Sequence, residues 1–398
     1  MLWNRFVSGL FLFVLGAPAF PVGAQAQAPA RPEHAILLVI DGFSYLAPER
    51  VDMKNLKAVM ARGSYYRESY SAPPQHPHSG EWAASFDSSI PNPILVAGTV
   101  FLRPGQKFVQ SSFFPLKFTA HIANELTYKA INQDFHFTFQ AGGNEFHAAH
   151  GGKRVDDDEN MFWTLTVLRR WKPVYMRVHL QDTGAMGGLS RNERSKGQPW
   201  YQNIWAEGSP FRQALLQADA HIGRLTDELR NLGIYDKTLL FVTGDHGQTA
   251  TGWHPPFAQD AWPMPVVLAG PGVKADQRFP YSEQIDIVPT LCHLMGVKPP
   301  ANADGRIMAE ALVNPPANIP PRRQDLKELS LVLAEADSRL TKLRDQARRN
   351  PSLQPVLAEV ERDFYDVERL LQWHKFGTVQ KLVAHNRQVL AKIPASIR

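Results

Sequence analysis

Three short apolar runs constrain the fold most strongly, because each has the length and composition of a buried strand. The runs are His34–Ile40, Val174–Leu180 and Thr238–Thr243. They are too short for buried helices and rich in β-branched or aromatic residues, as strands covered on both faces are. Between them lie helical patterns, the clearest over Ser209–Leu232, where Gly233 follows as a helix terminator. Strands that alternate with helices predict an α/β fold with a mostly parallel central sheet.

The chain changes character after a Pro-rich segment, Pro315–Pro321. Beyond it, Arg322–Arg349 and Leu353–Ile393 are rich in Leu, Ala, Glu, Lys and Arg at helical spacing. We therefore expect a main domain over 33–314 and an appended helical pair over 322–398. A packing or capping element is the commoner role of such a pair, and a partner-binding coiled coil is the alternative.

The N-terminus has the pattern of an export signal. Arg5 precedes the apolar run Phe6–Phe20, and Ala24-Gln25-Ala26 is a small-x-small cleavage site. The run is shorter than the roughly 20 residues of a membrane span. We expect a signal peptide over 1–26 and a protein that is exported to the periplasm or secreted, with no later membrane span. An uncleaved anchor is the alternative.

Charge and cysteine content exclude some classes. The 43 basic and 38 acidic residues are well mixed, without a long Lys/Arg block, so nothing indicates a nucleic-acid partner. Cys292 is the only cysteine, so the chain cannot form an intrachain disulfide. It lies in an apolar run and is expected to be a buried core thiol.

Acidic residues follow all three predicted strands. Asp41 follows the first, Asp182 the second, and Asp245-His246 the third, with His254 eight residues after His246. The carboxyl ends of parallel strands share one edge of a sheet, where ligands bind. Carboxylates gathered there would repel one another without a cation between them. The pattern favours a divalent metal site over the alternative that each Asp caps a following helix.

These residues stand in blocks that resemble the alkaline phosphatase superfamily, and especially its nucleotide pyrophosphatase/phosphodiesterase branch. The resemblance covers roughly 35–312 and is strongest in "HAILLVIDGF", "TLLFVTGDHGQ", "MPVVLAGPGVK" and "EQIDIVPTLCHLMGVKPPANADGR". It implies a three-layer sandwich and two neighbouring divalent metal ions, usually zinc. One ion would be held by Asp41, Asp245 and His246, and the other by Asp182 and His254.

The chain departs from the family pattern at the nucleophile. The family has a T-x-P-x-H motif where this chain has "SAPPQHPHSGEW", which puts Gln75 at the position of the attacking hydroxyl. Ser79 is the nearest hydroxyl and the candidate nucleophile, with His76 or His78 as base or ligand. The alternative is that Ser79 only caps the helix that follows it.

A second departure concerns a metal ligand. Met186 stands where the family's D-x-x-x-H pattern has a histidine, and a thioether is a poor ligand for zinc. His179 would replace it only if the strand end is bent. The Cys/Ser-x-Pro-x-Arg motif of formylglycine sulfatases is absent from the sequence.

The sequence thus predicts a metal-dependent hydrolase or transferase of phosphoesters, of the phosphodiester type, acting on a small anionic substrate. The rival is a degenerate family member that binds a metal or an anionic ligand without turnover. A third alternative is a scaffold protein whose helical tail carries the function. Substrate identity depends on the loops 102–158 and 190–209. The sequence specifies neither the substrate nor the oligomeric state.

Overall fold

The computed structural model describes most of the chain after the N-terminal segment. The described residues are 31–75, 84–86, 88–90, 95–96, 99–100, 107–124, 133–140, 156–301 and 303–397. None of the helices within these ranges combines the length and hydrophobicity that a membrane span requires.

An eight-stranded sheet forms the centre of the protein, in the order β10-β2-β9-β8-β1-β7-β5-β6. Its strands are β1 (His34–Ile40), β2 (Gly63–Tyr70), β5 (Thr119–Ala123), β6 (Phe137–Gln140), β7 (Tyr175–Leu180), β8 (Thr238–Gly244), β9 (Pro263–Ala269) and β10 (Gln277–Glu283). β9 runs antiparallel to both of its neighbours, and every other pairing is parallel. A separate antiparallel pair is formed by β3 (Leu95–Val96) and β4 (Thr99–Val100).

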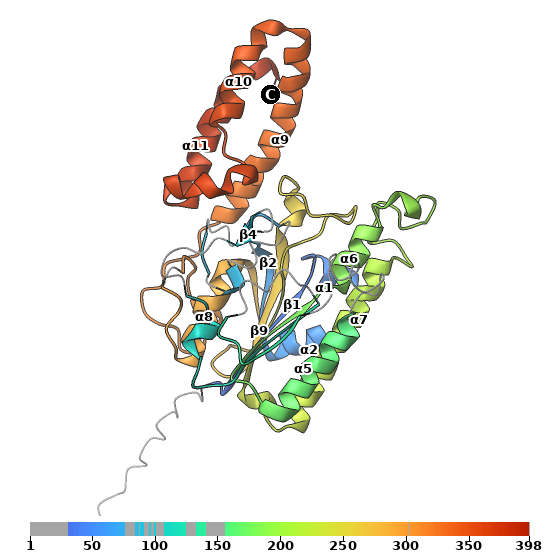
Figure 1. Ribbon diagram of the computed structural model, residues 1–398, viewed down its shortest axis with the longest axis vertical. Helices are drawn as coiled ribbons and strands as arrows, with labels where there is room; N and C mark the ends of the chain where they lie inside the picture. The colour runs from blue at the N-terminus through green and yellow to red at the C-terminus, as the bar shows by residue number, and fades with distance from the viewer. Residues whose placement is uncertain are drawn as a thin grey trace, which may run out of the picture.

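Helices cover the sheet on both faces (Figure 1). α2 (Lys54–Arg62), α5 (Asp157–Trp171) and α7 (Pro210–Asn231) pack on one face, and α6 (Asp182–Leu189) packs on α7. α8 (Ile287–Met295) packs on the other face. The short α1 (Ala47–Arg50) follows β1. This is the three-layer α/β sandwich that the sequence predicts.

Strand β1 shows why the apolar run is continuous. Its residues alternate between the two cores, with Ile36, Leu38 and Ile40 on the side of α2 and α7 and Ala35, Leu37 and Val39 on the side of α8. The other two predicted strands are confirmed to within one residue, as is the helix over Ser209–Leu232, which is α7. Cys292 is fully buried, and burial raises the pKa of its thiol to about 12.

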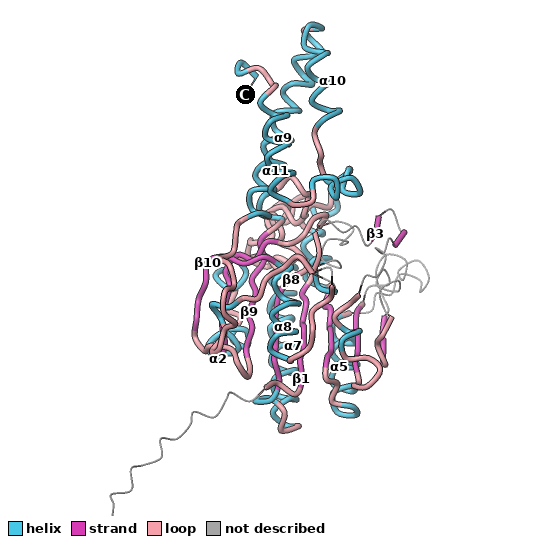
Figure 2. The backbone as a smooth tube through the Cα atoms, turned by 90° about the vertical axis from the view of Figure 1, so that its left-hand side faces the viewer, coloured by secondary structure: helices cyan, strands magenta, loops and turns pink. Residues whose placement is uncertain are grey.

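The C-terminal extension contains α9 (Asp325–Arg349), α10 (Gln354–Asp363) and α11 (Val379–Ala391). The prediction of a simple helical pair was wrong, because the second arm is divided. Asp366 accepts hydrogen bonds from the backbone N–H groups that start a 3₁₀ segment, Val367–Phe376. Gly377 then takes a left-handed φ of 71°, and Thr378 caps α11. The extension projects beyond one end of the sheet (Figure 2).

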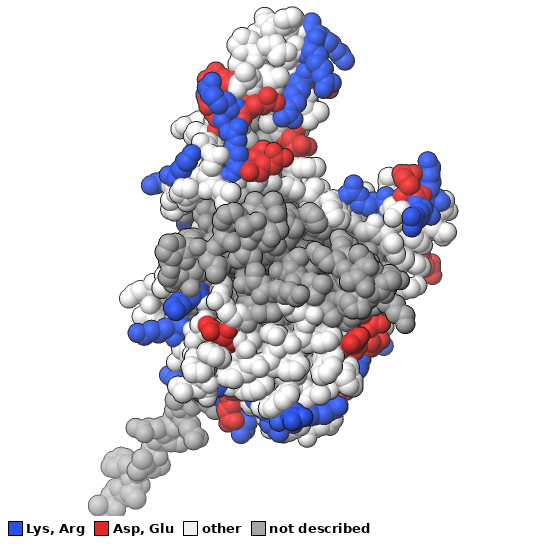
Figure 3. Space-filling view, viewed as in Figure 1, with Lys and Arg blue, Asp and Glu red and all other residues white. Residues whose placement is uncertain are grey.

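Basic and acidic side chains are interspersed on the extension in the face shown in Figure 3. Several form ion pairs between its helices, such as Arg344 with Glu361 at 2.7 Å and Lys392 with Asp363 at 3.0 Å. Its apolar residues form a core cluster that also includes Trp262 and Ile285 of the main sheet region. The extension is therefore packed against the body of the protein.

Arg322 joins the extension to the sheet. Its guanidinium lies 3.1 Å from Glu283 Oε2 at the end of β10 and donates hydrogen bonds to Asp286. Glu283 Oε1 also accepts a hydrogen bond from the backbone N–H of Leu326 at 3.0 Å, in the first turn of α9. Both carboxylates are almost fully buried. Burial raises the pKa of Glu283 to about 7; the neighbouring Arg322 opposes this rise, and the Asp286 carboxylate adds to it.

We expect Arg322→Gln to lower the free energy of unfolding by about 3 kcal/mol, because it leaves two buried carboxylates without their cation. Urea denaturation measures the change. The adjacent Arg323 is a matched control, since its side chain is 67% exposed in its ion pair with Asp325. Arg323→Gln should cost no more than about 1 kcal/mol. Equal effects of the two substitutions would contradict this account.

Candidate metal centre

Strand register brings two aspartates to the same level at the edge of the sheet. Ile40 of β1 pairs with Gly244 of β8, so Asp41 and Asp245 leave the sheet side by side. Because the two strands are parallel and in register, the two side chains project to the same face. Asp41 is 4% exposed and Asp245 1%. Two carboxylates are thus held together out of water, where their mutual repulsion calls for a compensating positive charge.

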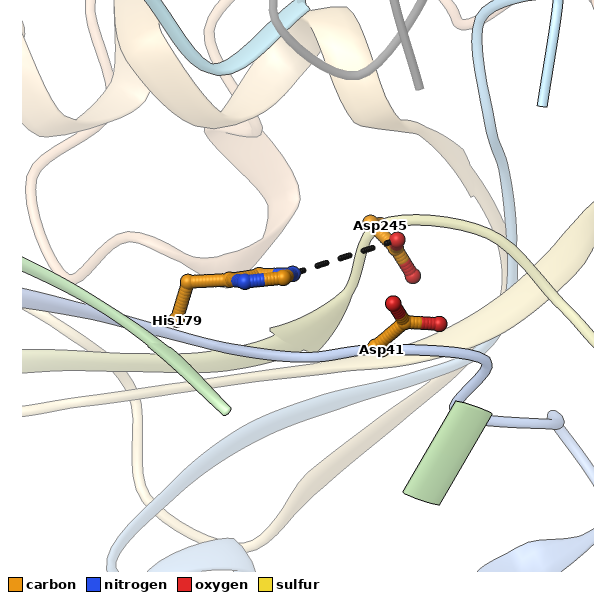
Figure 4. A group of neighbouring side chains, drawn as sticks. All are labelled: Asp41, His179 and Asp245. Carbon is orange, nitrogen blue, oxygen red and sulfur yellow. Dashed lines mark ion pairs between the residues drawn. The ribbon is translucent and has the colours of Figure 1, made fainter. Parts of the chain in front are cut away.

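His179 of β7 completes the group. It pairs with Val39, two residues before Asp41, and therefore projects to the same face as Asp41. Asp41, His179 and Asp245 each offer a ligand atom within 4.8 Å of the others (Figure 4). The His179 Nε2 atom lies 4.0 Å from Asp245 Oδ2. The ordinary alternation of the strand is enough to bring His179 to Asp41 and Asp245, without the bent strand end expected for a ligand in the place of Met186.

The Asp245 carboxylate is oriented by backbone groups. Its Oδ1 accepts hydrogen bonds from the N–H groups of Gly42 and His246, each at 2.8 Å. Its Oδ2 faces imidazole nitrogens instead. The side chain of Gln284 donates to the carbonyl oxygens of Gly244 and Asp245 and accepts from the N–H of Ala72. Gln284 thereby fixes the end of β8 to the end of β10.

His246 provides the test of whether a metal fits. Its Nδ1 lies 2.8 Å from the carbonyl oxygen of Gly247, which can only accept, so Nδ1 carries a hydrogen. Its Nε2 lies 3.3 Å from Asp245 Oδ2 and 3.8 Å from Asp41 Oδ1. In the neutral ring, Nε2 therefore carries a lone pair and no hydrogen. A lone pair directed at two carboxylates is favourable only when a cation lies between them. A divalent ion or a proton on Nε2 satisfies this geometry, and the donor set of carboxylate and imidazole suits zinc or manganese.

His254 lies beside this group through ring stacking. Its imidazole stacks on His246 with ring centroids 3.8 Å apart, and Trp253 stacks on His254 at 4.4 Å. His254 is buried, whereas Trp253 is half-buried. Of the first predicted ligand set, the structure brings Asp41, Asp245 and His246 together and adds His179.

Asp182, which the family resemblance pairs with His254 for a second ion, has a different environment. Its Oδ2 accepts a hydrogen bond from the N–H of Asp157 at 3.2 Å, and its own N–H donates to the Asp157 carboxylate. Asp157 lies in the first turn of α5 and is buried. Register explains the offset, since Gln181 is level with Asp41 and Asp245 while Asp182 is one residue further. Within the described ranges, the group of potential ligands includes neither Asp182 nor His254.

The predicted nucleophile region lies largely outside the described residues, which exclude Ser79, His76 and His78. Gln75 is described and buried, and its Nε2 donates to Ser71 Oγ at 3.1 Å. The neighbouring Ala72 is bonded to Gln284, which supports Asp245. The segment that leads to Ser79 therefore starts next to the metal group.

In sequence, this chain is similar to known sulfatases. Residues 177–297 match the family model described as Sulfatase. The chain is 29% identical to arylsulfatase K of Mus musculus over 137 residues, which are 33% of this chain and 23% of that protein. It is 30% identical to the extracellular sulfatase SULF-1 homolog of Drosophila melanogaster over 109 residues, 26% of this chain and 10% of that protein. The chain thus spans under a quarter of the length of either relative.

The overall structure is similar to a phosphonate monoester hydrolase of Silicibacter pomeroyi. The TM-score is 0.58 at 17% identity, with 73% of this chain and 78% of the other covered. Together with the family model, this likeness shows that the chain has the sulfatase-like fold of the alkaline phosphatase superfamily. The activity of this chain does not follow from the fold.

A substitution at Gly184 tests whether Asp41 binds the metal, because it leaves all the proposed ligands in the chain. Gly184 lies in α6 against Asp41, and a Cβ placed there would come 1.8 Å from Asp41 Oδ1. We expect Gly184→Ala to displace the carboxylate and to lower the affinity for zinc or manganese at least ~tenfold, measured by calorimetric titration.

Gly188, in the same helix, is the matched control, because nothing lies within 4 Å of its added Cβ. Gly188→Ala should keep the metal affinity and raise stability by up to about 1 kcal/mol through helix propensity. An unchanged affinity in Gly184→Ala would contradict the assignment of Asp41 to the metal group.

Proposed function

We propose that this protein is a metal-dependent hydrolase of phosphoesters, of the phosphodiester type. The observation that carries the proposal is the buried group of Asp41, His179 and Asp245 at the carboxyl edge of the sheet, with His246 directed at both carboxylates. These residues would hold a divalent ion. When bound, such an ion polarises an ester oxygen and lowers the pKa of a coordinated hydroxyl group.

The chain's own residues would orient the metal-binding side chains and exclude water from around them. The N–H groups of Gly42 and His246 fix the Asp245 carboxylate, and Gln284 fixes the backbone behind it. The His246 ring is held by Gly247 on one side and by His254 on the other. Ser79 is the proposed nucleophile. Cys292 is excluded from that role by its full burial in the α8 core and its raised thiol pKa.

A second candidate is a protein that binds one ion or an anionic ligand without turnover. Two observations favour it. Asp182 exchanges hydrogen bonds with Asp157 and is not in the group of three potential ligands found among the described residues. Gln75 occupies the position of the attacking hydroxyl in the family motif. The two candidates differ in turnover and in the number of bound ions.

The deciding experiment measures metal content by elemental analysis and turnover of bis-(p-nitrophenyl) phosphate on the same purified protein. We expect bound zinc or manganese and turnover that a chelator abolishes and the metal restores. His179→Gln should lower both metal content and turnover at least ~tenfold. His374→Gln is the matched control, because His374 is exposed on the C-terminal extension, and it should behave as the wild type.

Full turnover by the double variant Asp245→Asn/His246→Gln would overturn the hydrolase proposal. Bound metal without turnover of this substrate or of p-nitrophenyl sulfate would favour the binding candidate. Loss of turnover in Ser79→Ala with metal content retained would support Ser79 as the nucleophile.

We further propose that the protein is exported. The support is the signal-like pattern over 1–26 and the names of two similar proteins, which are called extracellular sulfatases in Drosophila melanogaster and Caenorhabditis elegans. Expression of the full chain in a bacterium, followed by mass spectrometry of the periplasmic fraction, should find a new N-terminus close to Ala26. Recovery of only the uncleaved chain, in the membrane fraction, would contradict export as a soluble protein.

A further inference from the structure

An open pocket of about 690 Å³ is lined in part by the segment on either side of His254, and the proposed function makes no use of it. Its lining includes Trp253, whose ring stacks on His254, which stacks in turn on His246. Two ring contacts therefore connect the wall of the pocket to the side chain that faces both metal-group carboxylates. This series of contacts makes the pocket a candidate for the part of a ligand that lies beyond the ester.

The chemistry of the lining indicates what that part is. Phe257 contributes an aromatic ring that is 47% exposed, and Trp253 contributes a second, half-buried ring. The guanidinium of Arg191 lies over Trp253, 5.3 Å from the ring centroid. The hydroxyls of Thr249 and Thr251 lie 3.1 Å apart on the same lining. Aromatic faces next to hydroxyl groups are suited to a ring with an apolar face and polar edges.

A neighbouring pocket indicates the charge of the ligand part that would bind here. Phe257 also lines a second pocket of about 390 Å³, whose other walls belong to the C-terminal extension, including Leu333 and Leu340 of α9. Its charged residues are Asp337, Asp366, Glu368 and Arg344, and Arg344 is paired with Glu361. This excess of negative charge disfavours a second anionic group on the ligand beyond Phe257.

We propose that the pocket lined by Trp253 and Phe257 is a subsite for the alcohol part of the substrate, and that this alcohol carries an uncharged aryl or sugar ring. The inference rests on the proposed function, since it takes the metal group as the place where the ester binds. It assigns specificity to the segment on either side of His254 and extends the substrate site toward the C-terminal helices.

Calorimetric binding to the metal-loaded protein tests the subsite without requiring turnover. The probes are phenylphosphonate and glucose 6-phosphate as ring-bearing ligands, and methylphosphonate as the ligand without a ring. We expect at least one ring-bearing ligand to bind about fivefold more tightly than methylphosphonate, and Phe257→Ala to remove that gain while Phe257→Tyr keeps it. Which ring shows the gain distinguishes an aryl from a sugar substrate.

Phe162 provides the control, because it is 57% exposed on α5 and is not part of the pocket lining. Phe162→Ala should keep the full gain. Equal affinity of all three ligands, or a gain that persists in Phe257→Ala, would overturn the subsite. Turnover of bis-(p-nitrophenyl) phosphate with no gain from a ring would overturn the subsite alone. A gain that depends on Phe257 in a protein without turnover would support the subsite and overturn hydrolysis.

Discussion

The register of β1 between β7 and β8 is the constraint on which the candidate site depends. It places Asp41 level with Asp245 and sets His179 two residues below them on the same face. All three side chains are buried, so the protein holds two carboxylates and an imidazole out of water. Such a group is stable when a cation or a proton compensates the charge, and costly when it does not. A one-residue slip of either neighbouring strand would turn one of these side chains to the opposite face.

The rest of the structure stabilises that register. Gln284 bonds the end of β8 to the segment after β2, and Glu283, the residue before it, binds the first turn of α9 and Arg322. The C-terminal extension is thus bonded to the backbone that supports Asp245. Its helices also line the second pocket, to which Pro256 and Phe257 contribute from the segment after His254. The extension is therefore bonded to the backbone behind the candidate site and packed against the segment that follows His254.

The fold alone leaves the chemistry open, because sulfatases and a phosphonate monoester hydrolase are both among the similar proteins. What separates such activities is the nucleophile and the ligand set at the carboxyl edge of the sheet. In this chain the sole cysteine is in the α8 core, and the described ligand group gathers around one position. Whether the protein turns a substrate over or only binds it depends on the residues after Gln75, which include the proposed nucleophile Ser79.

The sequence by itself determined the three central strands, the helix before β8 and the placement of Asp41 and Asp245 at the same edge of the sheet. The strands and the helix follow from periodicity, which is a local property, and the shared edge follows from the rule that parallel strands end on the same side of a sheet. It also placed Cys292 in the core. Only the tertiary structure decided that His179 joins Asp41 and Asp245, that Asp182 binds Asp157, and that Trp253 and Phe257 line the same pocket. The physical reason is that register and packing join residues far apart in the chain, and the pattern within any one segment does not specify which level of the neighbouring strand it meets.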